Sequence, residues 1–207
     1  YQTKCNHHYF DCIDTEEKAY WLGFLYADGN IQMPKGATLG SVYIGLQTRD
    51  SSHLAKFLLA LESSHNIHHY TYKVNVSVIR IPSNELPVAL ADKGCVLKKS
   101  LKLVFPSDSQ VPSKLQRHFI RGYFDGDGCL SMRQFVFLGT RPFLSGISER
   151  LPFAHDVTIK DIPGNRIKRL GVSIGRKRFA LICDWLYKDA TIYLDRKKEL
   201  FDNSILK

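Results

Sequence analysis

One apolar phrase occurs twice in this chain of 207 residues, and it constrains the fold more than any other feature. The copies are Trp21–Gly29 and Ile120–Gly128, which lie 99 residues apart, close to half the chain length. Each copy is typical of a helix that carries small residues four positions apart and ends in Asp-Gly. The repeat therefore predicts two related halves, each with one such helix.

Small residues recur at matched positions of the two expected helices. They are Gly23 and Ala27 in the first copy, and Gly122 and Gly126 in the second. Residues four positions apart share one helix face, and small residues there remove the side chains that keep helix axes about 8–10 Å apart. Because glycine inside a helix costs about 1 kcal/mol relative to alanine, its matched use favours a packing role. We therefore expect the two helices to pack on each other about a pseudo-two-fold axis.

Capping signals mark the ends of these helices. Asp14 or Thr15 is a candidate N-cap for the first helix, and Pro112 opens the second. Gly29 and Gly128 are expected to end the helices in the left-handed conformation, which glycine adopts without strain.

After each helix the apolar period changes from helical spacing to alternation, which is typical of strands. Ser41–Gln47 and Lys73–Val78 alternate in this way, and further segments with helical spacing follow in both halves. This order predicts an α+β fold of two pseudo-symmetric αββαββα halves, each with an antiparallel sheet, packed through the two motif helices. We expect a first half at 1–99, a short linker at 100–112 and a second half at 113–207.

The chain carries an excess of positive charge, with 29 Lys and Arg residues against 20 Asp and Glu residues and a formal net charge of +9. This balance favours a polyanionic partner, with nucleic acid first and an anionic membrane surface second, although charge for solubility alone is a simpler explanation. No apolar run reaches the roughly 18 residues that a membrane span needs, and no secretory signal is visible. The 5 cysteines are scattered and lack CxxC spacing, which favours a reduced intracellular setting over a disulfide framework.

Each motif helix ends in a carboxylate, Asp28 in the first and Asp127 in the second. A carboxylate at the C-terminal end of a helix faces the negative end of the helix dipole, and two such groups repel each other if the helices meet. A divalent cation relieves both penalties, and ligation by oxygen alone suits Mg²⁺, with water and phosphate oxygens completing its shell. An Asp-Gly helix end without function is the alternative for either copy alone, but the matched pair favours a metal site.

Each acid has a lysine at a matched distance along the chain. Asp28 precedes Lys99 by 71 residues, and Asp127 precedes Lys197 by 70. Carboxylates, hard metal ions and lysines together suit phosphodiester hydrolysis, in which the metals activate water and stabilise the leaving oxygen. The lysines would stabilise charge on the phosphate or tune the attacking water. Immediate neighbours fit the spacing almost as well, so two further candidates stay open: Lys98 and Lys198.

Both motifs closely resemble those of the LAGLIDADG homing endonucleases, a family named after this motif. The resemblance extends to the order of elements and the downstream lysines, thus to nearly the whole chain, and it points to the single-chain branch with two motifs. It implies a monomer that binds a long asymmetric site in double-stranded DNA, with two saddle-shaped sheets along the major groove, and makes a double-strand break.

In this family the last acid of each motif binds the catalytic metal. The resemblance therefore assigns that role to Asp28 and Asp127, with Mg²⁺ as the cofactor and with Ca²⁺ or Mn²⁺ as substitutes in crystals. It places Lys99 and Lys197 beside the scissile phosphates.

The resemblance is incomplete at one position. Tyr26 stands where the motif has an earlier acid, whereas Asp125 keeps that acid in the second copy. Because the family does not use this position as a metal ligand, we expect nuclease activity. Binding alone, as an RNA maturase for introns or a DNA-binding regulator, is the alternative. We also expect an intron-encoded protein and the cytoplasm or nucleoid of a bacterium or phage-infected cell rather than an organelle.

Alternation predicts which residues face the DNA. In Ser41–Gln47 the apolar residues at even positions are expected to face the core, which leaves Ser41, Tyr43 and Gln47 outward. In the second alternating segment, the three valines are expected inward. The residues between them are expected outward: Lys73, Asn75 and Ser77.

Arginine and lysine suit guanine edges or phosphates, and asparagine and glutamine suit adenine. Many such residues position a protein through phosphates without reading sequence. The full set of expected DNA contacts is Asn30, Gln32, Tyr43, Gln47, Arg49, Lys73, Asn75, Arg133, Gln134, Arg141, Lys160, Arg166, Lys168 and Arg169.

Overall fold

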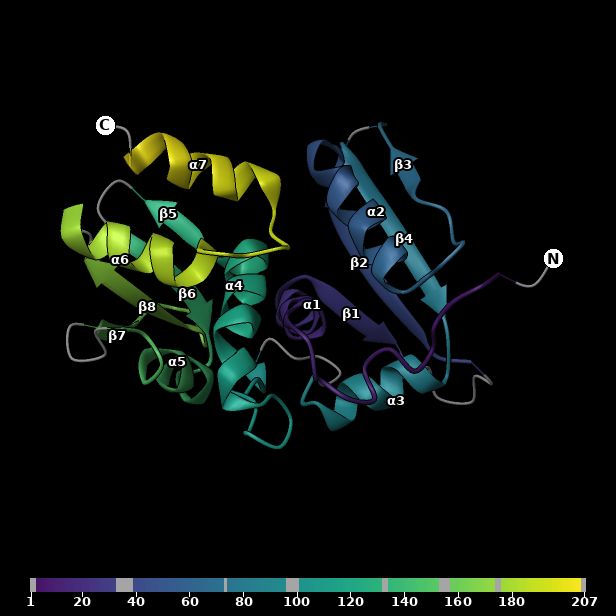
Figure 1. Cartoon of the computed structure of the whole chain (residues 1–207), viewed down its shortest axis with the longest axis horizontal. Helices are drawn as coiled ribbons and strands as arrows, with labels where there is room; N and C mark the ends of the chain where they lie inside the picture. Colours follow the sequence, from purple (N-terminus) through teal and green to yellow (C-terminus); the bar gives the residue numbers. More distant parts are fainter. Residues whose placement is uncertain are drawn as a thin grey trace.

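The computed structural model of the chain describes residues 3–32, 39–72, 74–95, 101–131, 134–152, 157–173 and 176–205 (Figure 1). The helices are α1 (Glu16–Ala27), α2 (Ser51–Ala60), α3 (Glu85–Asp92), α4 (Gln116–Asp127), α5 (Arg141–Ser148), α6 (Arg176–Tyr187) and α7 (Asp195–Ile205). The strands are β1 (Gly29–Gln32), β2 (Ser41–Gln47), β3 (His68–Tyr70), β4 (Val76–Pro82), β5 (Cys129–Ser131), β6 (Gln134–Gly139), β7 (Val157–Asp161) and β8 (Lys168–Ser173). Short 3-10 turns at Thr48–Asp50 and Ser113–Leu115 precede α2 and α4. The order is αββαββα in each half, with α7 added at the end.

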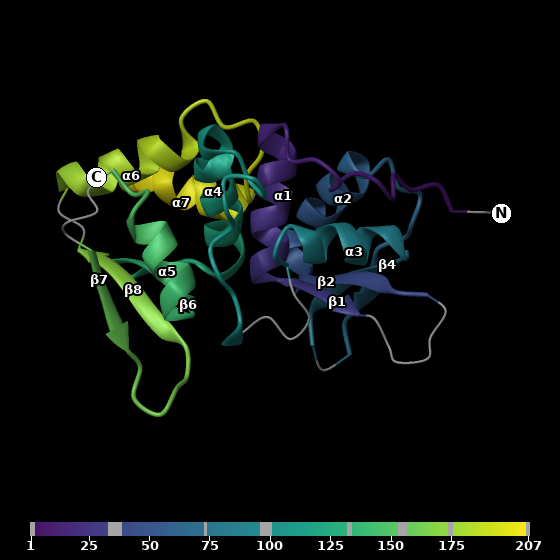
Figure 2. The same ribbon diagram turned by 90° about the horizontal axis from the view of Figure 1, so that it is seen from below.

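Each half contains one antiparallel sheet of 4 strands, and the two sheets have the same internal order. The first runs β1-β2-β4-β3 and the second runs β5-β6-β8-β7. In the first sheet, the long central pair of β2 and β4 matches Ser41 with Pro82 at one end and Gln47 with Val76 at the other. The repeated topology confirms the α+β fold of two pseudo-symmetric halves. Figure 2 shows both sheets on one side of the molecule.

The motif helices α1 and α4 lie side by side between the two sheets and join the halves (Figure 1 and Figure 2). A Cβ atom added to Gly23 would lie 1.9 Å from the carbonyl oxygen of Phe119. One added to Gly122 would lie 2.0 Å from the carbonyl oxygen of Tyr20. Folded proteins are close-packed and do not allow such short contacts, so both positions need glycine. Packing of the halves through the two motif helices is confirmed.

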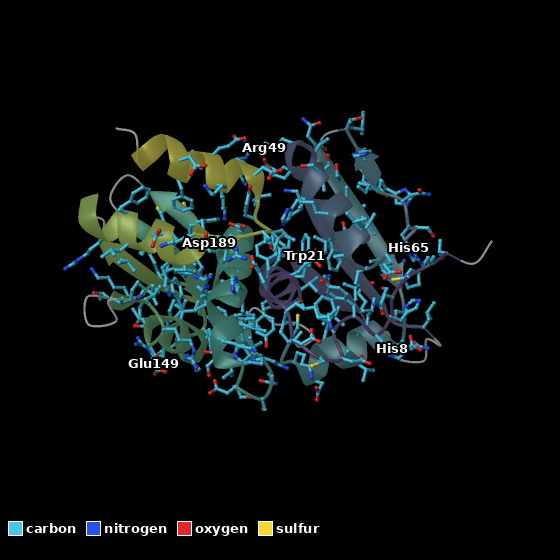
Figure 3. The ribbon with its side chains drawn as sticks, in the orientation of Figure 1. His8, Trp21, Arg49, His65, Glu149 and Asp189 are labelled. Carbon is cyan, nitrogen blue, oxygen red and sulfur yellow. The ribbon has the colours of Figure 1, made fainter. Side chains whose placement is uncertain are left out.

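The first motif helix is buried on all sides, which explains why it is apolar all round. Every residue from Ala19 to Tyr26 is buried. Trp21 faces α2, where its ring centroid lies 4.8 Å from those of His53 and Phe57 (Figure 3). α1 therefore contributes to the core of the first half on one side and to the joint between the halves on the other.

Arg121 is a fully buried cation on α4 that also joins the halves. Its Nη2 donates to Oε1 of Glu16, at the start of α1, at 2.7 Å. Its other nitrogens donate to the carbonyl oxygens of Leu186 at 2.9 Å and Ile192 at 3.0 Å. A buried charge is tolerated only when it is paired and hydrogen-bonded, and these contacts meet that requirement.

The glycines after the motif helices serve a different purpose from the predicted one. Gly128 has φ −70° and ψ 150°, and neither Gly29 nor Gly128 is among the glycines with positive φ. A Cβ atom on Gly128 would lie 2.0 Å from Cδ2 of Phe124, and one on Gly29 would lie 2.6 Å from Cδ2 of Leu25. The left-handed helix stop is therefore wrong. Glycine is needed at these positions because the chain turns back closely against the helix it has just left.

The predicted strand Lys73–Val78 is wrong in position and in facing. β4 begins only at Val76, and Lys73 lies outside the described residues. Within β4, Ser77 lies opposite the predicted inward residue Leu46, so it is on the inner face, while its valine neighbours are on the outer face. The phase of the strand follows the fully buried isoleucines further along β4, at 79 and 81, and not the valines.

Ser77 is 0% exposed, yet its hydroxyl is fully used. It contacts Nδ1 of His69 at 2.7 Å and donates to Oγ1 of Thr48 at 3.3 Å. Val74, in contrast, is exposed before the strand begins. A small hydroxyl with partners on neighbouring elements can therefore occupy an inner position that the sequence pattern assigned to valine.

The pattern of apolar residues does not predict α7. Most of its side chains are charged or polar, and among its described side chains Lys197 and Phe201 are the buried pair, four residues apart. The limits at residues 99, 100, 112 and 113 stay a prediction, because residues 96–100 lie outside the described part of the chain. None of the helices described is long and apolar enough to cross a membrane.

Candidate active site

The acid at the end of each motif helix lies where the ends of the two helices approach each other. Asp28 is the C-cap of α1, and Asp127 is the last residue of α4. A Cβ atom on Gly126 would lie 2.3 Å from Cβ of Ala27 and 3.2 Å from Oδ2 of Asp28. The carboxylate of Asp28 thus reaches the residue that directly precedes Asp127. The small residues Ala27 and Gly126 permit this approach.

Lys197 reaches the end of α4 from the first turn of α7. Its buried ammonium donates to the carbonyl oxygen of Gly128 at 2.7 Å and to that of Phe124. Burial lowers the pKa of Lys197 to about 8, whereas nearby carboxylates, Asp28 and Asp127 among them, favour its charged form. A cation at this position offsets the negative end of the α4 dipole and lies within electrostatic range of both acids.

The two neighbouring lysines of α7 differ in their contacts. Nζ of Lys198 pairs with Asp202 one turn further along the same helix, at 2.5 Å. The geometry therefore favours Lys197 over Lys198 as the lysine that accompanies the acids. The corresponding residues of the first half, Lys98 and Lys99, lie outside the described part of the chain.

The earlier motif position faces the protein interior. Asp125 is 1% exposed and accepts hydrogen bonds from the hydroxyls of Tyr20 at 2.8 Å and Tyr187 at 2.6 Å. Burial raises the pKa of Asp125, while its hydrogen bonds act in the opposite direction. The matched residue Tyr26 donates instead to the carbonyl oxygen of Lys93 at 2.6 Å.

The oxygen donors at the helix ends fit a hard divalent cation. Asp28 and Asp127 place two carboxylates where the helix dipoles favour positive charge. Nowhere in the described ranges do three or more His, Cys, Asp or Glu side chains form a group that could hold a metal ion. Mg²⁺ keeps several waters and is commonly held by one or two carboxylates together with substrate phosphates. Asp28 and Asp127 are therefore the residues that could hold it.

Solved structures share the fold of this protein over nearly the whole chain. The I-LtrWI LAGLIDADG homing endonuclease bound to target DNA is 14% identical, with 98% of this chain and 92% of that chain covered and a TM-score of 0.59. I-DmoI in complex with DNA and Ca is 16% identical, with 96% and 99% covered and a TM-score of 0.60. The meganuclease I-SmaMI bound to uncleaveable DNA is 9% identical, with 93% and 91% covered and a TM-score of 0.60.

This chain has the LAGLIDADG homing endonuclease fold. No protein-family model matches the sequence, and no curated protein matches it significantly. The similarity is thus one of fold, carried by the paired motif helices and the two sheets.

In this LAGLIDADG fold, the outer face of the first sheet carries polar side chains. Tyr43 on β2 lies opposite Asn30 on β1 and opposite Arg80 on β4, so the three share one face. Gln32 and Gln47, also predicted as DNA contacts, are exposed at the ends of their strands. Arg80 is an exposed cation that the sequence reasoning missed because it assigned the wrong phase to β4. The apolar residues on either side of Arg80 are the signal that could have found it.

The outer face of the second sheet of the LAGLIDADG fold is basic. Lys160 on β7 lies opposite Arg169 on β8, next to the buried Leu170, whose side chain faces the other way. Arg166 is exposed in the loop that joins these strands. Figure 2 shows this hairpin extending beyond the rest of the sheet.

Two residues predicted as DNA contacts, Arg141 and Lys168, do not lie on the outer face of the second sheet. Arg141, at the start of α5, pairs with Asp161 at 3.2 Å, and Lys168 pairs with the same carboxylate at 2.9 Å. Lys168 and Asp161 lie opposite each other in register, on the face that Leu170 shares. Their charges are therefore engaged on the helix side of the sheet.

The remaining predicted contacts lie at strand ends or outside the described residues. Arg49 and Asn75 are exposed where β2 ends and β4 is about to begin, and Arg49 lies near α7 in Figure 3. Gln134 begins β6. Arg133, like Lys73, falls outside the part of the chain that is described.

Proposed function

We propose that this protein is a site-specific DNA endonuclease that makes a double-strand break by phosphodiester hydrolysis with a divalent metal ion. The observation that carries the proposal is the approach of the Asp28 carboxylate to Gly126, the residue directly before Asp127, at the paired helix ends. Each carboxylate at a negative helix end is disfavoured by the helix dipole, and two such carboxylates near each other repel. A metal-dependent reaction on a phosphate accounts for them.

The solved structures of this fold support the substrate and the cofactor class. I-LtrWI and I-SmaMI are bound to DNA in those structures, and I-DmoI is in complex with DNA together with Ca or Mn. The formal net charge of +9 and the polar outer faces of both sheets suit a DNA partner. We take Mg²⁺ as the ion, because it suits two carboxylates with water and phosphate oxygens.

The roles of the residues follow from their positions. Asp28 and Asp127 would hold the metal ions, which when bound supply an activated water and stabilise the leaving oxygen. Lys197 keeps a positive charge beside the acids and stabilises negative charge on the phosphate. Residues on the outer faces, such as Tyr43 and Arg169, bind and orient the duplex before any bond breaks.

The acids of one polypeptide complete the acid pair, so we propose that the protein acts as a monomer. The same proposal includes an intron-encoded origin. It also includes an intracellular location, in a bacterium or phage-infected cell rather than an organelle.

The deciding experiment is incubation of the full chain with a library of duplex targets and Mg²⁺, followed by sequencing of the cut ends. A parallel reaction with EDTA measures dependence on the metal. We expect one long asymmetric site to be cut on both strands only when Mg²⁺ is present. Tight binding of one site without any cleavage would instead favour a binding-only protein, such as an RNA maturase or a DNA-binding regulator.

A further inference from the structure

The position of Lys197 depends on a short segment at the start of α7. The N–H of Lys197 donates to the carbonyl oxygen of Leu194 at 2.9 Å, which forms the first turn of the helix. The N–H of Leu194 in turn donates to Oδ2 of Asp125 at 2.7 Å. Asp125 therefore acts on the backbone of Lys197 through one intervening residue.

Asp125 is itself held from several elements. Its Oδ1 accepts from the hydroxyl of Tyr187 on α6, and its Oδ2 accepts from the hydroxyl of Tyr20 on α1. The hydroxyl of Tyr20 also contacts Nε2 of His53 on α2 at 2.9 Å. A buried chain of hydrogen bonds thus runs from α2 of the first half, across α1, to the start of α7.

A second attachment holds the same turn from α2 of the first half and from the 3-10 turn that precedes it. Nε and Nη2 of Arg196 donate to the carboxylate of Asp50 at 3.2 and 3.1 Å. Lys56 on α2 pairs with Asp195 at 2.7 Å. The first turn of α7 belongs to the second half in sequence, but the first half binds it.

The matched motif position of the first half makes a comparable contact. The hydroxyl of Tyr26 donates to the carbonyl oxygen of Lys93, which precedes Lys99 by 6 residues. Tyr26 and Asp125 thus each bind the backbone of a segment that leads to a lysine. One position donates and the other accepts.

We propose that Asp125, assisted by Asp50, is a positioning residue that holds the first turn of α7 so that Lys197 reaches the end of α4. A carboxylate suits this position because it has acceptor sites for three donors at once. What Lys197 does to a phosphate rests on the proposed nuclease function, whereas where Lys197 lies does not. The two claims can therefore be tested separately.

The test uses the full chain and four variants. Asp125→Leu removes every acceptor while keeping a similar volume. Asp125→Asn keeps one oxygen for Tyr20 and Leu194, and the hydroxyl of Tyr187 can rotate to accept from the amide nitrogen. Asp50→Asn weakens the second attachment, because the charge that pairs with Arg196 is lost. Tyr26→Phe is the matched control at the equivalent position of the first motif.

The first measurement is acetylation of lysines by a small reagent, quantified by mass spectrometry as the ratio of Lys197 to Lys198. Asp125→Leu should raise this ratio about fivefold or more, because the first turn of α7 opens locally and exposes the Lys197 ammonium. Asp125→Asn and Tyr26→Phe should leave it within about twofold of wild type, and Asp50→Asn should give an intermediate rise. An unchanged ratio in a folded Asp125→Leu protein would overturn the proposal, and if that variant does not fold, an unchanged ratio in Asp50→Asn overturns it.

The second measurement is single-turnover cutting with each DNA strand labelled separately. Lys197→Met identifies the strand that Lys197 serves. Asp125→Leu should slow that strand about tenfold or more, since a small displacement of a catalytic group is costly, and should change the other strand less than about threefold. Asp125→Asn should cut this strand at nearly the wild-type rate. Equal slowing of both strands would indicate general destabilisation and overturn positioning.

The outcomes separate the two hypotheses. If the wild-type chain cuts no DNA, the proposed function fails, and acetylation still decides whether Asp125 holds Lys197. If Lys197→Met slows cleavage of one strand while Asp125→Leu leaves cleavage of both strands unchanged, the nuclease function is supported and the positioning role of Asp125 is refuted.

Discussion

The ends of the two motif helices differ more than their sequences suggest. Both end in an acid, and both meet the other helix through a glycine with no room for a side chain. The position two residues before each acid has diverged. Both residues there are buried, but Tyr26 donates one hydrogen bond to a backbone carbonyl, whereas Asp125 accepts three hydrogen bonds. Symmetry is thus kept where the helices touch and is relaxed where each helix holds its own half together.

This difference has a physical basis. The contacts between α1 and α4 are backbone to backbone, so an added atom on either helix collides with the other. The interior contacts of Tyr26 and Asp125 use side chains, which can exchange a donor for an acceptor if the partner backbone presents the opposite group. Repeated halves are therefore expected to stay most alike at their shared joint.

The largest expected effect tests whether the acids at the two helix ends are both needed for DNA cleavage. Asp28→Asn and Asp127→Asn should each lower the single-turnover cutting rate about 1,000-fold or more, because each loses a charged oxygen ligand for the metal. DNA binding, measured by fluorescence anisotropy in Ca²⁺, should change far less. Asp189→Asn, at an exposed position with φ 56° that asparagine tolerates, is the control. Full cleavage by both acid variants would refute their assignment as ligands.

The joint between the halves should be equally intolerant on both sides. Gly23→Ala and Gly122→Ala each place a Cβ about 2 Å from a carbonyl oxygen of the other helix, so each should lower the free energy of unfolding by about 3 kcal/mol or prevent folding. Urea denaturation followed by circular dichroism measures this effect. Gly45→Ala, whose Cβ would lie 3.3 Å from the flexible hydroxyl end of Tyr43, serves as the mild comparison. Similar midpoints for all three variants would contradict the proposed close packing.

Substitutions at the diverged position, Tyr26 in one motif and Asp125 in the other, should lower the free energy of unfolding by different amounts. Asp125→Ala leaves two buried hydroxyls and one buried N–H without their acceptor and should cost about 3 kcal/mol. Tyr26→Phe removes one hydrogen bond to Lys93 and should cost about 1 kcal/mol. Denaturant midpoints of the two variants, compared with wild type, give the difference directly. Equal losses would mean that the two positions carry the same structural weight despite their different networks.

The smallest effect concerns His53, which is linked to Asp125 through the hydroxyl of Tyr20. Burial lowers the pKa of His53 to about 3 from its usual value of 6.5. The unfolded chain therefore takes up a proton that the folded protein refuses, so His53 makes stability fall as the pH drops from about 6.5 towards 3, by at most about 1.4 kcal/mol per pH unit. Denaturant midpoints between pH 7 and pH 4.5 measure this slope.

His53→Gln provides the matched comparison, because glutamine does not titrate and can still bond to the hydroxyl of Tyr20. The variant should show a shallower loss of stability in acid than the wild-type protein. Identical slopes would show that His53 does not contribute to acid sensitivity.

The sequence predicted the fold where its pattern repeats. The matched motifs predicted two halves joined through α1 and α4, and the alternation of β2 placed Tyr43 outward, opposite Asn30 and Arg80. It failed where local pattern and packing disagree. The three valines before Ile79 set a false phase for β4, because alternation alone cannot show which residues pair with the neighbouring strand.

Charge patterns were also ambiguous at this level. Lys168 and Arg141 look like DNA contacts in sequence, but both pair with Asp161 on the helix side of the sheet. The sequence alone does not show on which face of the sheet a charged side chain lies, because that depends on strand register and on partners distant in sequence.

By itself, the sequence determined that the chain has two related helices with small residues at one face and an acid at each end, because these features are local and repeat in register. Only the tertiary structure decided the rest: that Lys197 and not Lys198 contacts α4, that the first half binds the first turn of α7, and that Asp125 lies at the centre of this joint. The physical reason is that these contacts join residues far apart in the chain. Their geometry is set by how two halves pack, which no local pattern encodes.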